Sequence, residues 1–247
     1  MQFTARYRYA KSLDNVGSQF GFGGLNTFGV NQLAPFDPGN DYGRSDYDIR
    51  HRFIASFNWE VPFEKIGDRF FGGTGTAISR QIFGGWQLTG IFNVQSGTPF
   101  SVFNCAGITN AETPCPRVAL TGAVNQFGTN DPTAVAGFPN RFNFIDLSGL
   151  TAGNAAIVNT GFAPFSTSTT SRNFFEGPRF WNIDMGVSKR FKLAEDVGLQ
   201  FRGEFFNLFN HTNDFVLNGE TDISSTGFVP VIRSGRRHVQ LAVKLTF

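Results

Sequence analysis

The chain has 247 residues, of which 31 are Phe and 29 are Gly, while only 16 % are charged and the net charge is +2. Soluble domains carry about 25 % charged residues, so this composition departs from that of an ordinary soluble protein. No stretch approaches the roughly 18 apolar residues of a membrane-spanning helix, and no basic stripe interleaved with aromatics supports nucleic-acid binding.

The dominant hydrophobic period along the chain is two, and helical periodicity is nearly absent. Strict alternation of apolar and polar residues is typical of strands with two different faces, so the sequence predicts an all-β fold. Six segments alternate in this way, at residues 1–9, 48–61, 85–96, 180–191, 198–206 and 236–247.

The connections between these segments alternate in length. Residues 62–84 and 192–197 are the shorter connections, whereas residues 12–47, 97–179 and 207–235 are long and rich in Gly, Ser, Thr and Asn. Antiparallel strands with short periplasmic turns and long extracellular loops describe an outer-membrane β-barrel. In this arrangement the first, third and fifth strands run outward, and the chain ends at the periplasmic rim.

The polar face of the alternating segments is predicted to line the barrel lumen. An Arg turned toward the bilayer midplane costs roughly 2–4 kcal/mol, so the arginines identify the inward face and the Phe, Val and Leu face looks outward. The candidate lumen residues are Arg50, Arg52, Glu60, Asp184, Arg190, Arg202 and Glu204.

Aromatic residues near the strand ends are predicted to form a girdle at the membrane interface on the short-turn side. The candidates are Trp59, Trp86, Trp181 and Phe191, together with the terminal Phe247. The alternative is a soluble β-sandwich that packs the same rings into its core.

Four stretches of the chain resemble the carboxy-terminal barrel of TonB-dependent outer-membrane receptors, especially the Oar-like branch. They are RSDYDIRHRF at 44–53, GGWQLTGIFNVQSGTPF at 84–100, RGEFFNLFNHTN at 202–213 and the terminal VQLAVKLTF. The terminal pattern is similar to the signal by which the barrel-assembly machinery recognises its clients. The resemblance places this signal at Val239, Leu241, Val243, Leu245 and Phe247.

Receptors of this class resemble a 22-stranded barrel plugged by an amino-terminal domain. Neither that plug domain nor an energy-coupling box is found in residues 1–247, and six strands are fewer than the eight of the smallest bacterial barrels. We therefore expect residues 1–247 to be the carboxy-terminal portion of a longer receptor barrel. The implied partners are outer-membrane lipid, the barrel-assembly machinery and, through the missing amino-terminal part, the energy-coupling TonB complex.

Residues with catalytic or metal-binding chemistry are dispersed along the chain. His51, His211 and His238 lie in separate segments, and no phosphate loop or nucleophile elbow is present. We therefore expect no enzyme activity, no cofactor and no metal site. The acidic run Asp37, Asp41, Asp46 and Asp48 lacks the spacing of a calcium loop, so a solvated loop is favoured over a Ca²⁺ site.

Cys105 and Cys115 are the two cysteines of the chain, and both lie in the long connection 97–179. Their closeness suits a local disulfide in an oxidising compartment, which would contribute about 3 kcal/mol in the chain-entropy model. Two free thiols in a flexible loop are the alternative.

The expected function is import by an outer-membrane receptor whose long loops bind a ligand at the cell surface. The alternative is a small self-contained barrel of eight strands with a structural or adhesive role. This alternative needs two further strands, for which residues 141–147 and 163–169 are weak candidates. An outer-membrane enzyme is a third reading, and it lacks a catalytic cluster.

Overall fold

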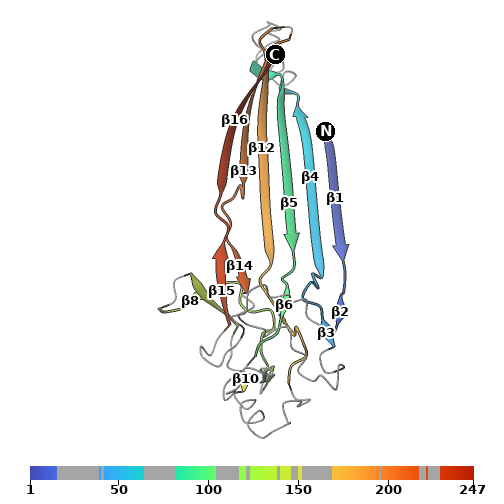
Figure 1. Ribbon diagram of the computed structural model, residues 1–247, viewed down its shortest axis with the longest axis vertical. Helices are drawn as coiled ribbons and strands as arrows, with labels where there is room; N and C mark the ends of the chain where they lie inside the picture. The colour runs from blue at the N-terminus through green and yellow to red at the C-terminus, as the bar shows by residue number, and fades with distance from the viewer. Residues whose placement is uncertain are drawn as a thin grey trace.

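The chain folds into one long antiparallel sheet with several short strands gathered at one end (Figure 1). The computed structural model describes residues 1–15, 39, 42–63, 82–103, 117–120, 123–137, 140–145, 150–151, 169–194, 196–216, 221 and 229–247. In spatial order the long sheet contains β1 (Gln2–Tyr9), β4 (His51–Val61), β5 (Trp86–Gln95), β12 (Phe180–Lys192), β13 (Gly198–Phe206) and β16 (His238–Thr246). Among all the described residues, no helix is long and apolar enough to cross a membrane.

The six strands of the sheet coincide with the six segments predicted from alternation, which confirms the all-β antiparallel fold class. The main difference is the start of β4 at His51 rather than at residue 48. Residues 45–49 form a turn instead, in which the Asp48 amide donates to the Ser45 carbonyl at 3.0 Å. This turn holds the backbone of residues 45–48 just before β4 begins.

Both chain termini, the end of β4 and the start of β5 lie at one end of the sheet, which we call the turn end (Figure 1). The described parts of the long connections lie at the opposite end, the loop end. β1 runs from the turn end to the loop end, and β16 runs back to the turn end, so the strand directions agree with the prediction.

Short strands form small sheets at the loop end. They are β2 (Leu13–Asp14), β3 (Gly43–Arg44), β6 (Pro99–Phe100), β7 (Ala119–Leu120), β8 (Thr133–Ala134), β9 (Arg141–Ile145), β10 (Leu150–Thr151), β11 (Phe175–Glu176), β14 (Asn213–Val216) and β15 (Val229–Ser234). β9 belongs to a four-stranded sheet with β8, β14 and β15, so residues 141–145 add no strand to the long sheet. Most of the other weak candidate strand, residues 163–168, lies outside the described residues.

The buried apolar core lies at the loop end rather than on the long sheet. Within the described residues it contains Phe100, Val102, Val118, Phe144, Ile145, Phe175 and Val231. The rings of Phe100 and Phe175 stack at 5.7 Å between centroids, where β6 pairs with β11. Apolar side chains of the long sheet are most exposed on its two edge strands, where Phe3 is 62 % and Leu241 is 78 % exposed, and most of those on the inner strands are half-buried. A face of this kind is suited to contact with lipid.

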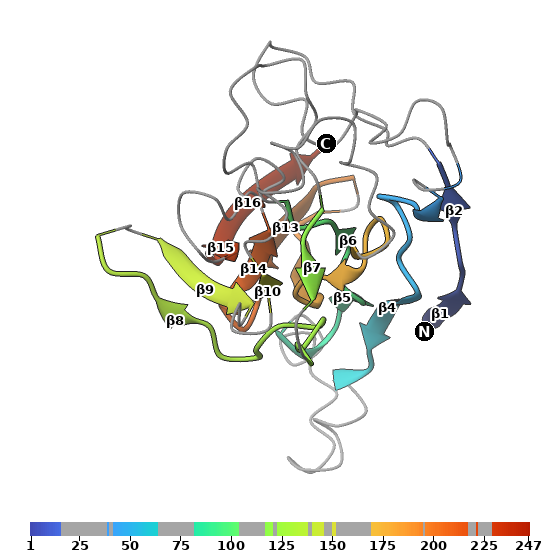
Figure 2. The same ribbon diagram turned by 90° about the horizontal axis from the view of Figure 1, so that it is seen from below.

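The long sheet is open, with β1 at one edge and β16 at the other. Viewed from below, these two strands stand apart at opposite sides of the curved row (Figure 2). Unpaired backbone groups are costly in lipid, so closure of the barrel requires hydrogen-bonding partners for the edge groups of both strands.

Candidate functional site

One face of the long sheet carries six of the seven polar residues predicted for the lumen, and the seventh, Arg50, precedes β4. Residues opposite each other in an antiparallel pair point to the same side. Glu60 of β4 aligns through β5 and β12 with Arg202 of β13, which places both on one face. The same registers and the alternation along each strand place Arg52, Asp184, Arg190 and Glu204 on that face.

This polar face is the concave side of the sheet. A single hollow touches residues of β1, β4, β5, β12 and β13, among them Thr4, Asn58 and Glu204. Five strands line one hollow only where the sheet curves toward it. Since a barrel encloses its concave side, the curvature supports the prediction that this face lines a lumen.

Arginines concentrate on the loop-end half of the polar face, on β1 and β4. Arg8 and Arg52 are direct cross-strand partners, and Arg6 lies two residues before Arg8 on the same face. Nε of Arg52 is buried without a hydrogen-bond partner. Arg202, further toward the turn end, instead pairs with Glu204 at 2.6 Å. The face is therefore cationic near the loops, whereas Arg202 is paired with a carboxylate.

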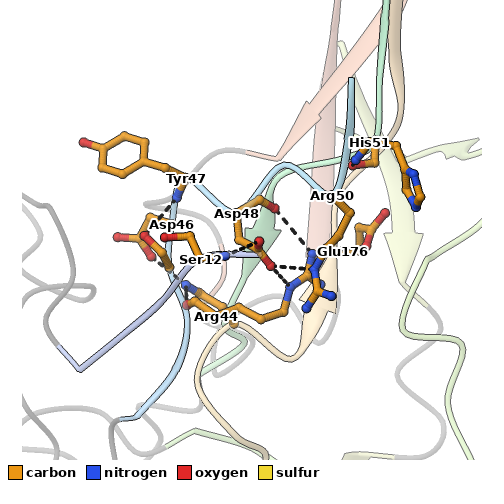
Figure 3. A network of polar contacts seen from close by, with 11 residues as sticks. Ser12, Arg44, Asp46, Tyr47, Asp48, Arg50, His51 and Glu176 are labelled. Carbon is orange, nitrogen blue, oxygen red and sulfur yellow. Dashed lines mark hydrogen bonds and ion pairs between the residues drawn. The ribbon is translucent and has the colours of Figure 1, made fainter. Parts of the chain in front are cut away.

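Asp48 is the centre of a polar network at the loop end (Figure 3). Its carboxylate is 1 % exposed and accepts hydrogen bonds from the Ser12 amide, Arg44 Nε and Arg50 Nε, each at 2.8 Å. Arg44 also reaches the Glu176 carboxylate at 3.3 Å. The network thus joins the end of β1 and the start of β4 to β11.

The ionisation of Asp48 follows from these contacts. Burial is the largest single influence and would raise the pKa of the Asp48 carboxyl. The hydrogen bonds from Arg44, Ser12 and Arg50 together outweigh burial, so the pKa of Asp48 lies below its usual range. The hydrogen bond to Asp48 raises the pKa of the Arg50 guanidinium in turn.

A second polar cluster packs against this network. Arg172 forms ion pairs with Asp14 and, at 3.2 Å, with Asp46. Nδ2 of Asn173 donates to the Arg44 carbonyl and to Asp46 Oδ1, both at 2.7 Å. Asp46, like Asp48, is therefore bound to a guanidinium, and the RSDYDIRHRF motif fastens the first long connection to the second. Asp37 and Asp41 of the acidic run lie outside the described residues.

The FNLFNHTN stretch forms a tight bend where β13 leaves the sheet. Asn207 adopts a positive φ of 54°, and its amide N–H donates to Asp184 Oδ1 at 2.8 Å. Its side-chain Nδ2 donates to the carbonyls of His211 and Gly235 at 2.7 and 2.8 Å, and its Oδ1 accepts from the His211 amide at 2.9 Å. Asn207 therefore links the end of β13 to the chain that enters β16.

Trp181 lies at the loop end, so the prediction that it lies on the short-turn side is wrong. β12 starts at the loop end, and Trp181 is its second residue, opposite Val94. Asn213 binds both backbone groups of Trp181 at 3.0 Å, and the His211 ring stacks on the indole at 3.9 Å. Burial lowers the pKa of His211, against a smaller opposing effect of Asp214. The candidates at the turn end are Trp59, Trp86 and Phe191.

Lys189 occupies the apolar face, which the sequence analysis did not predict. It lies opposite Trp86 on β5 and is 5 % exposed. Its ammonium is 5.5 Å from the centroid of the Trp86 ring and 4.9 Å from that of Phe191, and it donates to the Gly84 carbonyl. Aromatic faces attract a cation in this way, which lowers the cost of a charge on the apolar face. The sequence did contain a sign of this, because residues 188–190 are all polar. Side chains alternate between the two faces of a strand, so at least one of these three must lie on the apolar face.

Among the residues that the structure describes, no three His, Cys, Asp or Glu side chains gather as a metal site. Cys105 and Cys115 lie outside those residues, so their disulfide remains a prediction.

A family model described as an outer membrane beta barrel domain matches residues 1–240. No curated protein and no solved structure matches the chain. Because the family match covers nearly the whole sequence, the chain belongs to this family of outer-membrane β-barrel domains. It is a protein of the bacterial outer membrane, and its long sheet is barrel wall.

Proposed function

We propose that the chain forms part of a TonB-dependent outer-membrane receptor of the Oar-like branch, which binds a ligand at the cell surface and imports it. The observation that carries this proposal is the difference between the two ends of the wall. The turn end holds short connections, whereas the loop end is a folded layer with its own small sheets and apolar core. Folded loops on a rigid scaffold are where binding sites are most often built.

The networks around Asp48 and Asn207 support this role. Asp48 fastens the first long connection to β11, and Asn207 fastens the third to β16. Loops held at their bases in this way present a defined surface, which lowers the entropy that ligand binding must overcome. We propose that this surface binds the ligand and that the chain performs no bond chemistry.

The partners in this proposal are those of the receptor class. The outward face of β16, with Val239, Leu241, Val243 and Leu245, would be recognised together with Phe247 by the barrel-assembly machinery. Energy coupling to TonB would pass through a plug and coupling segment outside residues 1–247.

Comparison of spent growth medium tests the proposal. The source bacterium, a strain deleted for this gene and a strain deleted for tonB are grown in the same medium, and the compounds left behind are identified by mass spectrometry. A receptor predicts at least one compound that the wild type consumes and both deletion strains leave behind. Full consumption by the gene-deletion strain would contradict import.

The alternative, a self-contained structural or adhesive barrel, is tested in the same strains. It predicts unchanged consumption together with loss of surface attachment, and heat-modifiable gel migration of the purified chain by itself.

A further inference from the structure

We propose that Arg8 and Arg52, together with Arg6, bind a carboxylate that carries a neighbouring hydroxyl group, on the concave face of the sheet just below the loops. The inference rests on the proposed function only in taking this hydroxycarboxylate to be part of the imported ligand. The site itself follows from the register and from two buried polar atoms.

The first observation is that two guanidinium groups face each other directly. Arg8 and Arg52 are Cα partners in the β1–β4 register, so both side chains leave the same face of adjacent strands. Arg6 lies two residues along the same face of β1. Like charges directly opposite each other destabilise a strand pair. An anion bound between or above the two groups would relieve this repulsion.

The described residues supply no such anion. Asp48 and Glu176 are engaged by Arg44 and Arg50, and no carboxylate forms an ion pair with Arg6, Arg8 or Arg52 within the part of the chain that the structure describes. The acid nearest in register on this half of the face is Asp184. It lies across β5, and it already accepts hydrogen bonds from the Asn207 amide and Asn182 Nδ2 at 2.8 Å each.

The second observation concerns two buried atoms that lack partners. Nε of Arg52 is a donor without an acceptor, and Oδ1 of Asn93 is an acceptor without a donor. Arg52 pairs with Gln95, so Asn93 is its diagonal neighbour on the same face of β5. A buried polar group without a partner is costly, which makes both atoms available to a ligand.

The chemistry of the two atoms defines the ligand class. A carboxylate accepts charge-assisted hydrogen bonds from guanidinium groups, and a hydroxyl on the next carbon donates to an amide oxygen. A 2-hydroxycarboxylate presents both functions at adjacent positions. A simple carboxylate satisfies Arg52 and leaves Asn93 unpaired, so the site discriminates between the two.

Binding of L-malate and of succinate, which lacks the hydroxyl, tests the proposal. The protein is isolated in detergent from the outer membrane of its own bacterium and titrated at low salt by isothermal calorimetry. L-malate is expected to bind at least about fivefold more tightly than succinate, since one hydrogen bond separates them. Arg52→Gln and Arg8→Gln are each expected to weaken malate binding by about tenfold or more. Arg202→Gln is the matched control, because Arg202 is already paired with Glu204 on the same face.

Thermal unfolding distinguishes a variant that has lost the binding site from one that is misfolded. Removing one of two repelling charges should leave the unfolding temperature of Arg52→Gln equal to or above that of the wild type when malate is absent. Malate should then raise the unfolding temperature of the wild type and leave that of Arg52→Gln unchanged. Absence of malate binding, equal binding of succinate, or equal malate affinity of Arg52→Gln would each overturn the inference. Binding without any TonB-dependent uptake would retain this site and reject the receptor role.

Discussion

Phe57 and Gly90 face each other across β4 and β5, and the Phe57 ring covers the space that a side chain at position 90 would occupy. A Cβ atom built on Gly90 would overlap two ring carbons of Phe57. Both residues belong to the apolar face, so the ring covers Gly90 on the side where lipid contact is expected. Glycine at position 90 is therefore a packing requirement of the wall, although glycine in a strand interior is otherwise unfavourable.

Replacing Gly90 by Val is expected to destabilise the wall by about 1–3 kcal/mol, because the Phe57 ring must move out of its position. The measurement is the urea midpoint of the protein in detergent, followed by heat-modifiable gel migration. Gly203→Ala is the control, since a Cβ there would meet Leu241 at an ordinary 3.5 Å. The double variant Phe57→Leu with Gly90→Val should recover part of the loss. Equal midpoints for Gly90→Val and Gly203→Ala would contradict this account.

Asn207 is expected to stabilise the bend after β13 in two separable ways. Asn207→Gly tolerates the positive φ and loses the three side-chain hydrogen bonds. Asn207→Ala loses the same hydrogen bonds and in addition disfavours the positive φ. The cost should be about 1–3 kcal/mol for Gly and larger for Ala, measured by the same urea midpoint.

Asn210 provides the comparison for Asn207. It also has a positive φ, of 52°, and its Oδ1 accepts from the exposed Arg237 amide at 3.0 Å. Asn210→Gly should therefore cost less than Asn207→Gly. The reverse order would show that the buried bonds of Asn207 do not hold the bend.

The wall could be predicted from the sequence because its pattern is local. Alternation of apolar and polar residues locates each strand, and the lengths of the connections indicate which ends lie together. The same pattern predicts which residues share a face. The error at Trp181 came from ignoring strand direction, since a residue that starts an inward-running strand lies at the loop end.

The loop end could not be predicted because its contacts join residues far apart in the chain. Arg44 and Glu176, or Arg172 and Asp14, belong to different long connections, and no local period links them. The unpaired Arg8 and Arg52 were hidden for a similar reason. Each appears as one polar residue in an alternating strand, and only the pairing register shows that they face each other.

Asp48 makes the stability of the loop end depend on pH. Its pKa is lower in the folded protein than in the unfolded chain, so its ionised form contributes stability above the unfolded value of about 4. That contribution is lost as pH falls below about 4 and through the lower folded value. The expected result is a steady unfolding temperature from about pH 5 to 8, followed by a decrease at lower pH.

Asp48→Asn separates this effect from general acid denaturation. The variant is expected to lose about 2–3 kcal/mol at neutral pH, because two guanidinium groups lose their shared anion. Its difference from the wild type should shrink as the pH falls, since protonation removes the same charge from the wild type. A difference that stays constant down to pH 3 would contradict the assigned role of Asp48.

The direction of the wall in the membrane predicts which positions are reached from outside the cell. Tyr47 is 68 % exposed at the loop end, and Asp196 is exposed in the turn between β12 and β13. In a background with serine at positions 105 and 115, Tyr47→Cys should react in intact cells with a maleimide too large to pass through porins. Asp196→Cys should react only after the outer membrane is permeabilised. The opposite labelling would place the long connections in the periplasm, and a ligand-binding surface formed by them would then have no access to the medium.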